Sequence, residues 1–268
     1  MEDGKMTKME SIFKVIFSTM RLQMKSSFAR PMFRFCLLCN PLMNTVFLYF
    51  LYSERGVDVF LSYVILGAGL MGIWGCICFS SIGDINRERF SATLSLIYTS
   101  PVGFGVVILG KILGNTLLSL LTFVLSYFTT IAISGKVFVV AYPLHFLLAF
   151  IVMIFCFSIV SIGIAYAMML SRKTELYMNL IELPVVFLCG FTFPVEVLPK
   201  WVQAISNFLV PTWAVRTLRS SATGVGIETY WHGIGIEVVE IVACVIISLV
   251  LFAFVDKRVR ISATLEVS

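Results

Sequence analysis

Few side chains in this sequence have the types and spacing that catalysis or nucleotide binding requires. Gly105, Gly110 and Lys111 imitate a nucleotide-binding loop, but Ile112 stands where such a loop has the Ser or Thr that binds magnesium. The two histidines are far apart, and neither a Ser/His/Asp arrangement nor a His-Glu-x-x-His motif is present. The sequence therefore predicts a chain that is not an enzyme and has no catalytic residue of its own.

The cysteines do not predict a metal or redox site either. Cys36 and Cys39 have the spacing of a metal-binding pair, but no second pair or nearby His completes a set of ligands. All seven cysteines fall inside apolar runs, where a free Cys behaves as a small hydrophobic residue. We expect no metal, no disulfide and no cofactor in this chain.

A few polar residues inside apolar runs remain as candidates for function. Glu182 lies deep enough in such a run that its charge must face protein or water, either in a substrate path or in a structural hydrogen bond. Glu237 and Glu240 share one helix face, where they could bind a cation or basic substrate, or form a hydrated rim. The candidate substrate path therefore consists of Asn179, Glu182, Glu237 and Glu240.

The composition places these residues in a membrane. Of the 268 residues, 59% are hydrophobic and 13% are charged, whereas a typical soluble domain is about 45–50% apolar and about 25% charged. So few charges cannot cover a surface that faces water, which excludes an ordinary soluble enzyme, a disordered protein and a secreted disulfide scaffold. The net charge of +5 then marks a cytoplasmic membrane face rather than a surface for nucleic acid.

Six apolar runs approach or exceed the length of a transmembrane helix. They lack the alternation of a barrel strand, and only helices and closed barrels satisfy the backbone in lipid. The runs cover approximately residues 35–52, 59–82, 106–134, 141–170, 176–193 and 233–255. The expected fold class is an all-α membrane protein with six transmembrane helices.

Two further segments are expected at the membrane surfaces. Residues 1–34 are basic, and their apolar residues recur in three- and four-residue steps, which predicts an amphipathic interfacial helix. Residues 195–210 are apolar but too short to span, which predicts a re-entrant or amphipathic outer element between the fifth and sixth helices. We expect one transmembrane domain over residues 1–268, with the interfacial helix at 1–34 and the six-helix bundle at 35–268.

The distribution of Lys and Arg predicts the orientation. If the N-terminus is cytoplasmic, most of the 20 Lys and Arg residues fall on the cytoplasmic side, which also holds the C-terminus. The long connection between the second and third runs is then cytoplasmic. It carries the charges of Asp84, Arg87, Glu88 and Arg89 before a short helix-compatible segment that ends at Pro101. Such a segment could dock into a groove of a cytoplasmic partner or could be a solvated turn.

This connection resembles the coupling-helix region of ABC-2-type transporter permeases, whose usual form is approximately E-R-x-x-G-T-L-E-x-L-x-x-[TS]-P-[VI]. The matching residues are Glu88, Arg89, Thr93, Leu94, Leu96, Thr99, Pro101 and Val102, while Ala92 replaces the usual Gly and Ser95 the usual Glu. Residues 179–213 resemble a second family pattern, L-P-x-W-[LV]-Q with flanking Gly and Pro, through Gly190, Pro194, Leu198, Pro199, Trp201, Gln203 and Pro211.

The resemblance implies the membrane permease of an ABC exporter, similar to drug and antibiotic exporters, in the cell membrane with both termini in the cytoplasm. Separate cytoplasmic ATPase subunits would bind ATP and magnesium, and a second permease, identical or homologous, would complete the complex in the bilayer. The implied ATPase-coupling residues are Asp84, Arg87, Glu88, Arg89, Thr93, Leu94 and Leu96. The implied substrate is an amphiphile such as a drug, peptide antibiotic or lipid. The alternatives are a permease for lipid-linked glycans and a six-span scaffold or immunity protein without transport.

Overall fold

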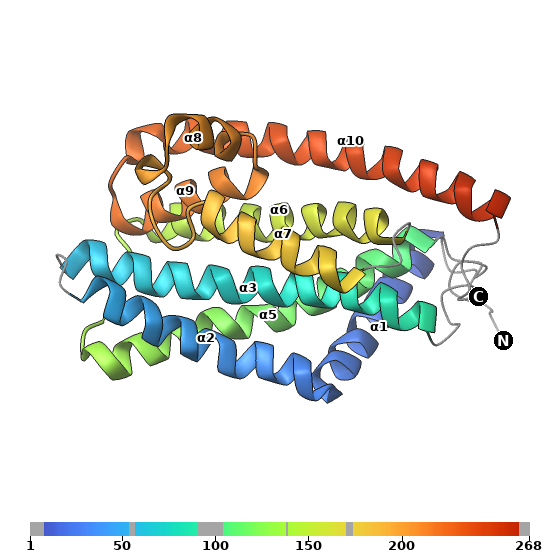
Figure 1. The fold of residues 1–268 in the computed structure, drawn as a ribbon, viewed down its shortest axis with the longest axis horizontal. Helices are drawn as coiled ribbons and strands as arrows, with labels where there is room; N and C mark the ends of the chain where they lie inside the picture. Colours follow the sequence, from blue (N-terminus) through green and yellow to red (C-terminus); the bar gives the residue numbers. More distant parts are fainter. Residues whose placement is uncertain (1–7, 54–56, 91–103, 138, 170–173, 263–268) are drawn as a thin grey trace.

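The computed structural model describes residues 8–53, 57–90, 104–137, 139–169 and 174–262. Within these ranges the chain forms nine α-helices and two short 3₁₀ helices, and no strand (Figure 1). The expectation of an all-helical protein is confirmed. The absence of strands follows from the composition of the runs, because long uninterrupted apolar segments satisfy their own backbone groups only as helices.

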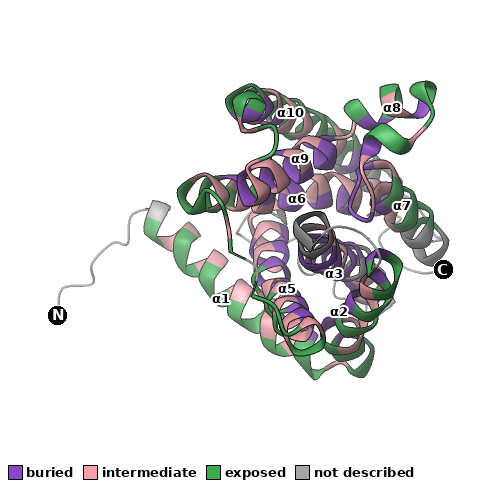
Figure 2. Ribbon diagram, turned by 90° about the vertical axis from the view of Figure 1, so that its left-hand side faces the viewer, coloured by how far each residue is buried: buried purple, intermediate pink, exposed green. Residues whose placement is uncertain are grey.

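Six helices run back and forth along the long axis of the molecule (Figure 1). They are α2 (Pro31–Tyr52), α3 (Val57–Phe90), α5 (Phe104–Ser134), α6 (Pro143–Met169), α7 (Thr174–Leu188) and α10 (Tyr230–Ser262). The central one is α3, which packs against α2, α5, α6 and α7 (Figure 2). Proline opens both α2 and α6, a position where its missing N–H is not needed.

Four helices of the described part of the chain are long and apolar enough to cross a membrane, and they are Pro31–Tyr52, Gly105–Ser134, Pro143–Met168 and Ile227–Val255. They coincide with the expected first, third, fourth and sixth spans. The expected second span lies within α3, whose apolar part is Tyr63–Cys78. The expected fifth span coincides with α7, which at 15 residues is about 22 Å long and shorter than a hydrocarbon core of ~30 Å. The number of six spans therefore stays a prediction.

The expected N-terminal helix is α1 (Lys8–Ala29), which lies along the edge of the bundle against α5 (Figure 2). It ends because Arg30 precedes Pro31 and takes an extended conformation, which bends the chain into α2. Its outer face exposes Phe13 and Phe17, whereas its inner face buries polar Gln23. The exposed aromatic face is the one that an interfacial helix would place in the membrane surface.

At the opposite end of the bundle, the chain between α7 and α10 folds into short helices (Figure 1). They are η1 (Val195–Val197), α8 (Lys200–Asn207), α9 (Val210–Thr223) and η2 (Ile227–Thr229). The expected outer element over 195–210 corresponds to η1 and α8, and α8 is amphipathic, with Trp201 exposed and Val202 buried. The helix α9 was not predicted from the sequence. It packs against α6 and α10, and it ends at Gly224, whose φ of +77° lies in the left-handed region.

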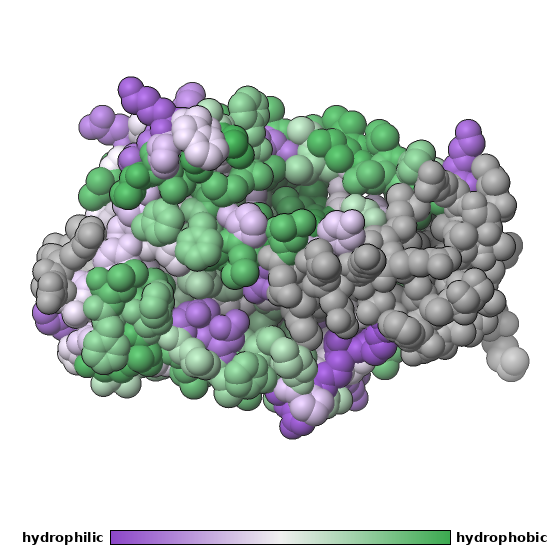
Figure 3. Space-filling model, viewed as in Figure 1, coloured by the Kyte–Doolittle hydropathy of each residue, from purple (hydrophilic) through white to green (hydrophobic). Residues whose placement is uncertain are grey.

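The core centres on Trp74 of α3. Its ring packs edge-on against Phe157 of α6 at 5.3 Å and against Phe191, just after α7, at 6.5 Å between centroids. On the outside, the coloured part of the face in Figure 3 is mostly hydrophobic, and hydrophilic residues gather over α8 and where α1 meets α2, with smaller groups elsewhere. This division suits helices that cross an apolar layer between two polar surfaces.

Candidate functional site

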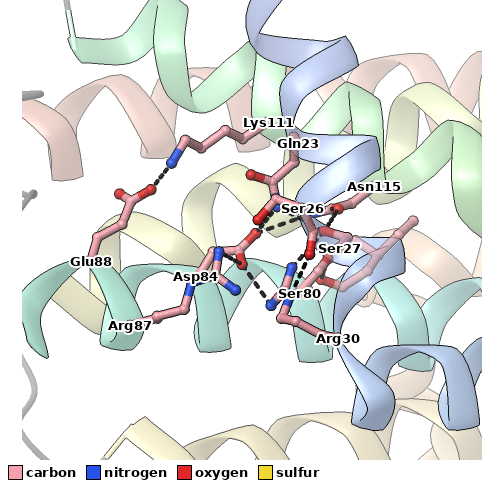
Figure 4. A network of polar contacts seen from close by, with 11 residues as sticks. Gln23, Ser26, Ser27, Arg30, Ser80, Asp84, Arg87, Glu88, Lys111 and Asn115 are labelled. Atoms are coloured by element: carbon pink, nitrogen blue, oxygen red, sulfur yellow. Dashed lines mark hydrogen bonds and ion pairs between the residues drawn. The ribbon is translucent and has the colours of Figure 1, made fainter. Parts of the chain in front are cut away.

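The most connected polar group lies at the end of α3 that adjoins α1. Asp84 is only 4% exposed, and its carboxylate accepts hydrogen bonds from four side chains (Figure 4). Asn115 of α5 donates at 3.0 Å, Arg30 at 2.9 Å and Arg87 at 3.0 Å, and Gln23 of α1 is the fourth donor. A carboxylate only accepts hydrogen bonds and all four partners donate through N–H groups, so the four donors match the acceptor oxygens of Asp84.

A hydroxyl extends these contacts between α1 and α5. Ser27 is fully buried, donates to Asn115 Oδ1 at 2.7 Å and accepts from Gln23 Nε2 at 2.9 Å. We call Gln23, Ser27, Arg30, Asp84 and Asn115 the Asp84 network. Burial lowers the pKa of the Arg30 guanidinium, and the nearby Asp84 carboxylate opposes that shift. The network thereby joins α1, α3 and α5 through buried, mutually satisfied polar groups.

Two glycines of α5 let α1 approach closely enough for these bonds. A Cβ on Gly114 would lie 2.7 Å from the backbone oxygen of Met20, and one on Gly110 would lie 3.0 Å from that of Ile16. A side chain at either position would push α1 away, since backbone carbonyls cannot rotate aside as side chains do. Small residues four apart are the usual means of such close helix packing.

One turn beyond Asp84, Glu88 forms an ion pair with Lys111 of α5. Both side chains are largely buried, with 8% of the Glu88 side chain and 15% of the Lys111 side chain exposed. The pair borders a cavity of about 210 Å³ between α1, α3 and α5, which Thr19 and Gln23 also line. The lysine that imitates a nucleotide-binding residue in the sequence is therefore occupied by a carboxylate of its own chain.

The structure brings together three of the seven predicted coupling residues, which are Asp84, Arg87 and Glu88. Both Asp84 and Glu88 point into the bundle. Asp84 binds Gln23, Arg30 and Asn115, which Ser27 links to one another, and Glu88 binds Lys111. Sequence reasoning missed these partners. The only signals were Asn115 within an apolar run, and Gln23 and Ser27 one turn apart. The side chain of Arg89 and the residues Thr93, Leu94 and Leu96 lie outside the described residues.

The predicted path residue Glu182 faces protein. It is half-buried on α7, and a Cβ on Gly75 of α3 would lie 2.8 Å from its Oε1. The same Cβ would lie 4.0 Å from Nδ2 of Asn40, which belongs to α2. Because Gly75 has no side chain, α3 leaves room at this position for the carboxylate of Glu182. The side chain of Asn179 lies outside the described residues.

The other two predicted path residues lie elsewhere, on α10. Glu237 is fully buried and accepts a hydrogen bond from Thr217 of α9 at 3.1 Å, while its Oε1 has no hydrogen-bond partner in the described part of the chain. Glu240 is partly exposed, with one buried oxygen equally unpaired there. Glu182 contacts α3 and Glu237 contacts α9, so the structure does not gather the predicted path residues around one point. The described residues contain no group of three or more His, Cys, Asp and Glu side chains that could hold a metal.

A large cavity, of about 980 Å³, lies at the α8–α9 end, and we call it the α9 cavity. It is lined by α9, η1, the start of α10 and the chain before α6. On its wall, Arg216 pairs with Glu196 at 3.0 Å, and Arg219 donates to the backbone oxygens of Gly190 at 3.0 Å and Phe191 at 3.3 Å. Arg219 thereby fixes α9 to the turn that follows α7.

Comparison with known proteins agrees with this architecture. A family model for the ABC-2 type transporter matches residues 14–222, which reach from α1 to α9. The match includes the Asp84 network, the end of α3 and most of the α9 cavity. A search of curated proteins finds no match to the chain. Since the family model covers most of the sequence, the chain belongs to the ABC-2 type transporter family, whose members are membrane transport components.

Proposed function

We propose that this chain is the permease subunit of an ATP-driven ABC exporter, with ATP and magnesium bound by separate cytoplasmic ATPase subunits. The observation that carries the proposal is the Asp84 network at the end of α3. The resemblance to a coupling helix begins at Glu88 and Arg89 in the last turn of α3 and continues through the residues that directly follow this helix, to Val102. The network supports coupling because it ties the helix leading into that segment to two other helices.

In this proposal the buried charges transmit motion rather than contact the ATPase. Asp84 and Glu88 are bonded to α1 and α5, so a push on the segment after Phe90 would move the ends of three helices together. Such a displacement would tilt α3 against α7, where Glu182 lies over Gly75. A path for an amphiphilic substrate would open there, between this permease and a second, identical or homologous one.

The proposed orientation places the Asp84 end in the cytoplasm and the α9 end outside the cell membrane. The basic residues of α1 and the start of α2 support it, because Lys and Arg accumulate on the cytoplasmic side. They are Lys14, Arg21, Lys25, Arg30 and Arg34. Both termini would then be cytoplasmic.

The test uses the pair between Glu88 and Lys111. The tagged permease is purified from native membranes, and the ATPase that accompanies it is quantified together with transport. Glu88→Lys places two like charges side by side and should reduce both ATPase recovery and transport. The double variant Glu88→Lys with Lys111→Glu restores the pair in reverse and should recover most of both. Glu228→Lys, an exposed position at the α9 end, makes the same charge change and should have no effect.

Two outcomes would contradict the proposal. A permease that purifies without an ATPase and still transports at the full rate would show that no ATPase drives it. If the double variant regains the thermal stability of the parent chain but not its ATPase recovery, Glu88 acts on the ATPase directly. The transmission through α5 would then be wrong.

A further inference from the structure

We propose that the α9 cavity binds the anionic head group of an amphiphile, with Arg216 and Arg219 as the recognising residues. The inference names a substrate class for the proposed exporter and rests on that function only for transport. Binding itself depends on the cavity alone. The argument starts from the charges on the cavity wall and then turns to its apolar rim.

Arg219 is a cation that forms no ion pair with a carboxylate of the described residues. Its Nη atoms donate to the backbone oxygens of Gly190 and Phe191, and its Cζ lies 3.9 Å from the centre of the Tyr63 ring. Within the described part of the chain, no carboxylate lies within ion-pair distance of Arg219, and its buried Nε has no hydrogen-bond partner. Carbonyls and a ring hold the guanidinium in place, and Glu196 attracts it only from beyond ion-pair distance, so a direct anionic partner is favoured.

Arg216 is a second cation whose partner can be displaced. It pairs with Glu196, but 36% of the Arg216 side chain and 67% of the Glu196 side chain are exposed. Exposed pairs of this kind contribute little to stability and are screened by salt. Trp213 lies under the guanidinium, with 5.1 Å between Cζ and the ring centre, so Arg216 stays over the cavity when Glu196 leaves. One turn of helix separates the two arginines, and both line the same cavity.

The rest of the lining suits a hydrocarbon chain. Val137, Val139 and Val225 line the cavity and are 64%, 79% and 77% exposed, which leaves apolar side chains open at the rim. The volume of about 980 Å³ lies at the upper end of the range of small-molecule sites, about 300–1,000 Å³. A cationic ligand is disfavoured, because the described lining holds two arginines and a single carboxylate, Glu196, which already has a partner.

The test measures binding by the purified permease in nanodiscs of zwitterionic lipid, without an ATPase. The probe is dodecyl phosphate with bromine on the second carbon of its chain, beside the head group, where it quenches the fluorescence of Trp213 on contact, and Trp213→Phe defines the background. Loss of one charged hydrogen-bond donor should weaken binding about tenfold in Arg216→Gln and in Arg219→Gln. Glu196→Gln should strengthen binding, because it removes the competing carboxylate. Lys200→Gln, which removes an exposed charge of α8 outside the cavity, should leave binding unchanged.

Three results would overturn the proposal. The first is equal quenching by a brominated dodecyltrimethylammonium, which carries the opposite charge. The second is displacement by inorganic phosphate at the same concentration, which would make the ligand a free anion rather than an amphiphile. The third is unchanged affinity in both Arg216→Gln and Glu196→Gln. These two variants decide the matter even if Arg219→Gln fails to fold, because their side chains are exposed. Failed binding with an ATPase still co-purifying would refute this inference and leave the proposed function standing.

Discussion

Replacing Asp84 tests whether its network holds α1 against the bundle. Asp84→Ala removes the acceptor of four donors at once and leaves two guanidiniums facing each other. Breaking a buried ion pair costs about 3–5 kcal/mol. The side chains of Arg30 and Arg87 are 23% and 38% exposed and regain some water, so we expect the lower end, about 3 kcal/mol of the free energy of unfolding. Asp84→Asn keeps an acceptor oxygen and should lose about half as much.

The measurement is the free energy of unfolding in detergent, together with protease cleavage at the bend between α1 and α2. Asp84→Ala should lower the free energy of unfolding and accelerate protease cleavage, because α1 then leaves α5. The matched control is Glu196→Ala, which also removes a carboxylate 3.0 Å from an arginine, but one whose side chain is 67% exposed. That change should cost less than about 1 kcal/mol. If both variants lose the same stability, or if Asp84→Ala loses none, the network does not hold α1 in place.

Three further predictions address packing, the path and the topology. Gly114→Ala should destabilise the chain by about 1–3 kcal/mol, because its Cβ would meet the Met20 carbonyl at 2.7 Å. Gly83→Ala, whose Cβ would meet nothing within 4 Å, should stabilise the chain by up to ~1 kcal/mol. If thermal unfolding shows Gly114→Ala to be the more stable of the two variants, the close packing of α1 on α5 is wrong. Glu182→Gln should leave expression intact but reduce export if the charge serves the path, whereas normal transport and stability in Glu182→Leu would exclude both a path role and a structural one. Lys200→Cys, in a background without the native cysteines, should react with an impermeant thiol reagent added to whole cells, and labelling only after lysis would reverse the proposed orientation.

The helices themselves could be predicted because the signal is local. An apolar run such as 141–170 needs no partner to become a helix in lipid, and it coincides with α6 to within a few residues. Pro31 and Pro143 open helices for reasons that depend only on their own backbone. The extent of α7 could not be predicted in this way. The run continues to Phe193, but the chain turns at Gly190, whose φ of +75° depends on the packing around it.

The partners of the charged residues could not be predicted, because they come from distant parts of the chain. Asp84 and Glu88 stand in a run of charges that is typical of a solvated loop, and only α1 and α5 make their burial possible. The helix α9 was missed for a related reason. Its residues are mixed, with Arg216 and Arg219 among apolar ones, and the groups that hold them come from other positions of the α9 end: Glu196 for Arg216 and the Gly190 carbonyl for Arg219. A pattern along the sequence does not show which distant residues will contact these charges.

The span of the Asp84 network along the chain has a consequence for the order of assembly in the membrane. Gln23 reaches Asp84 across 61 positions, and Ser27 reaches Asn115 across 88. When the ribosome has completed α1 and α2, neither of these acceptors has yet been synthesised. The exposed aromatic face of α1 can meanwhile rest on the membrane surface, while its polar face stays in water. Docking of α1 must therefore follow insertion of α5, so α1 is synthesised before α3 and α5 but reaches its place only after them.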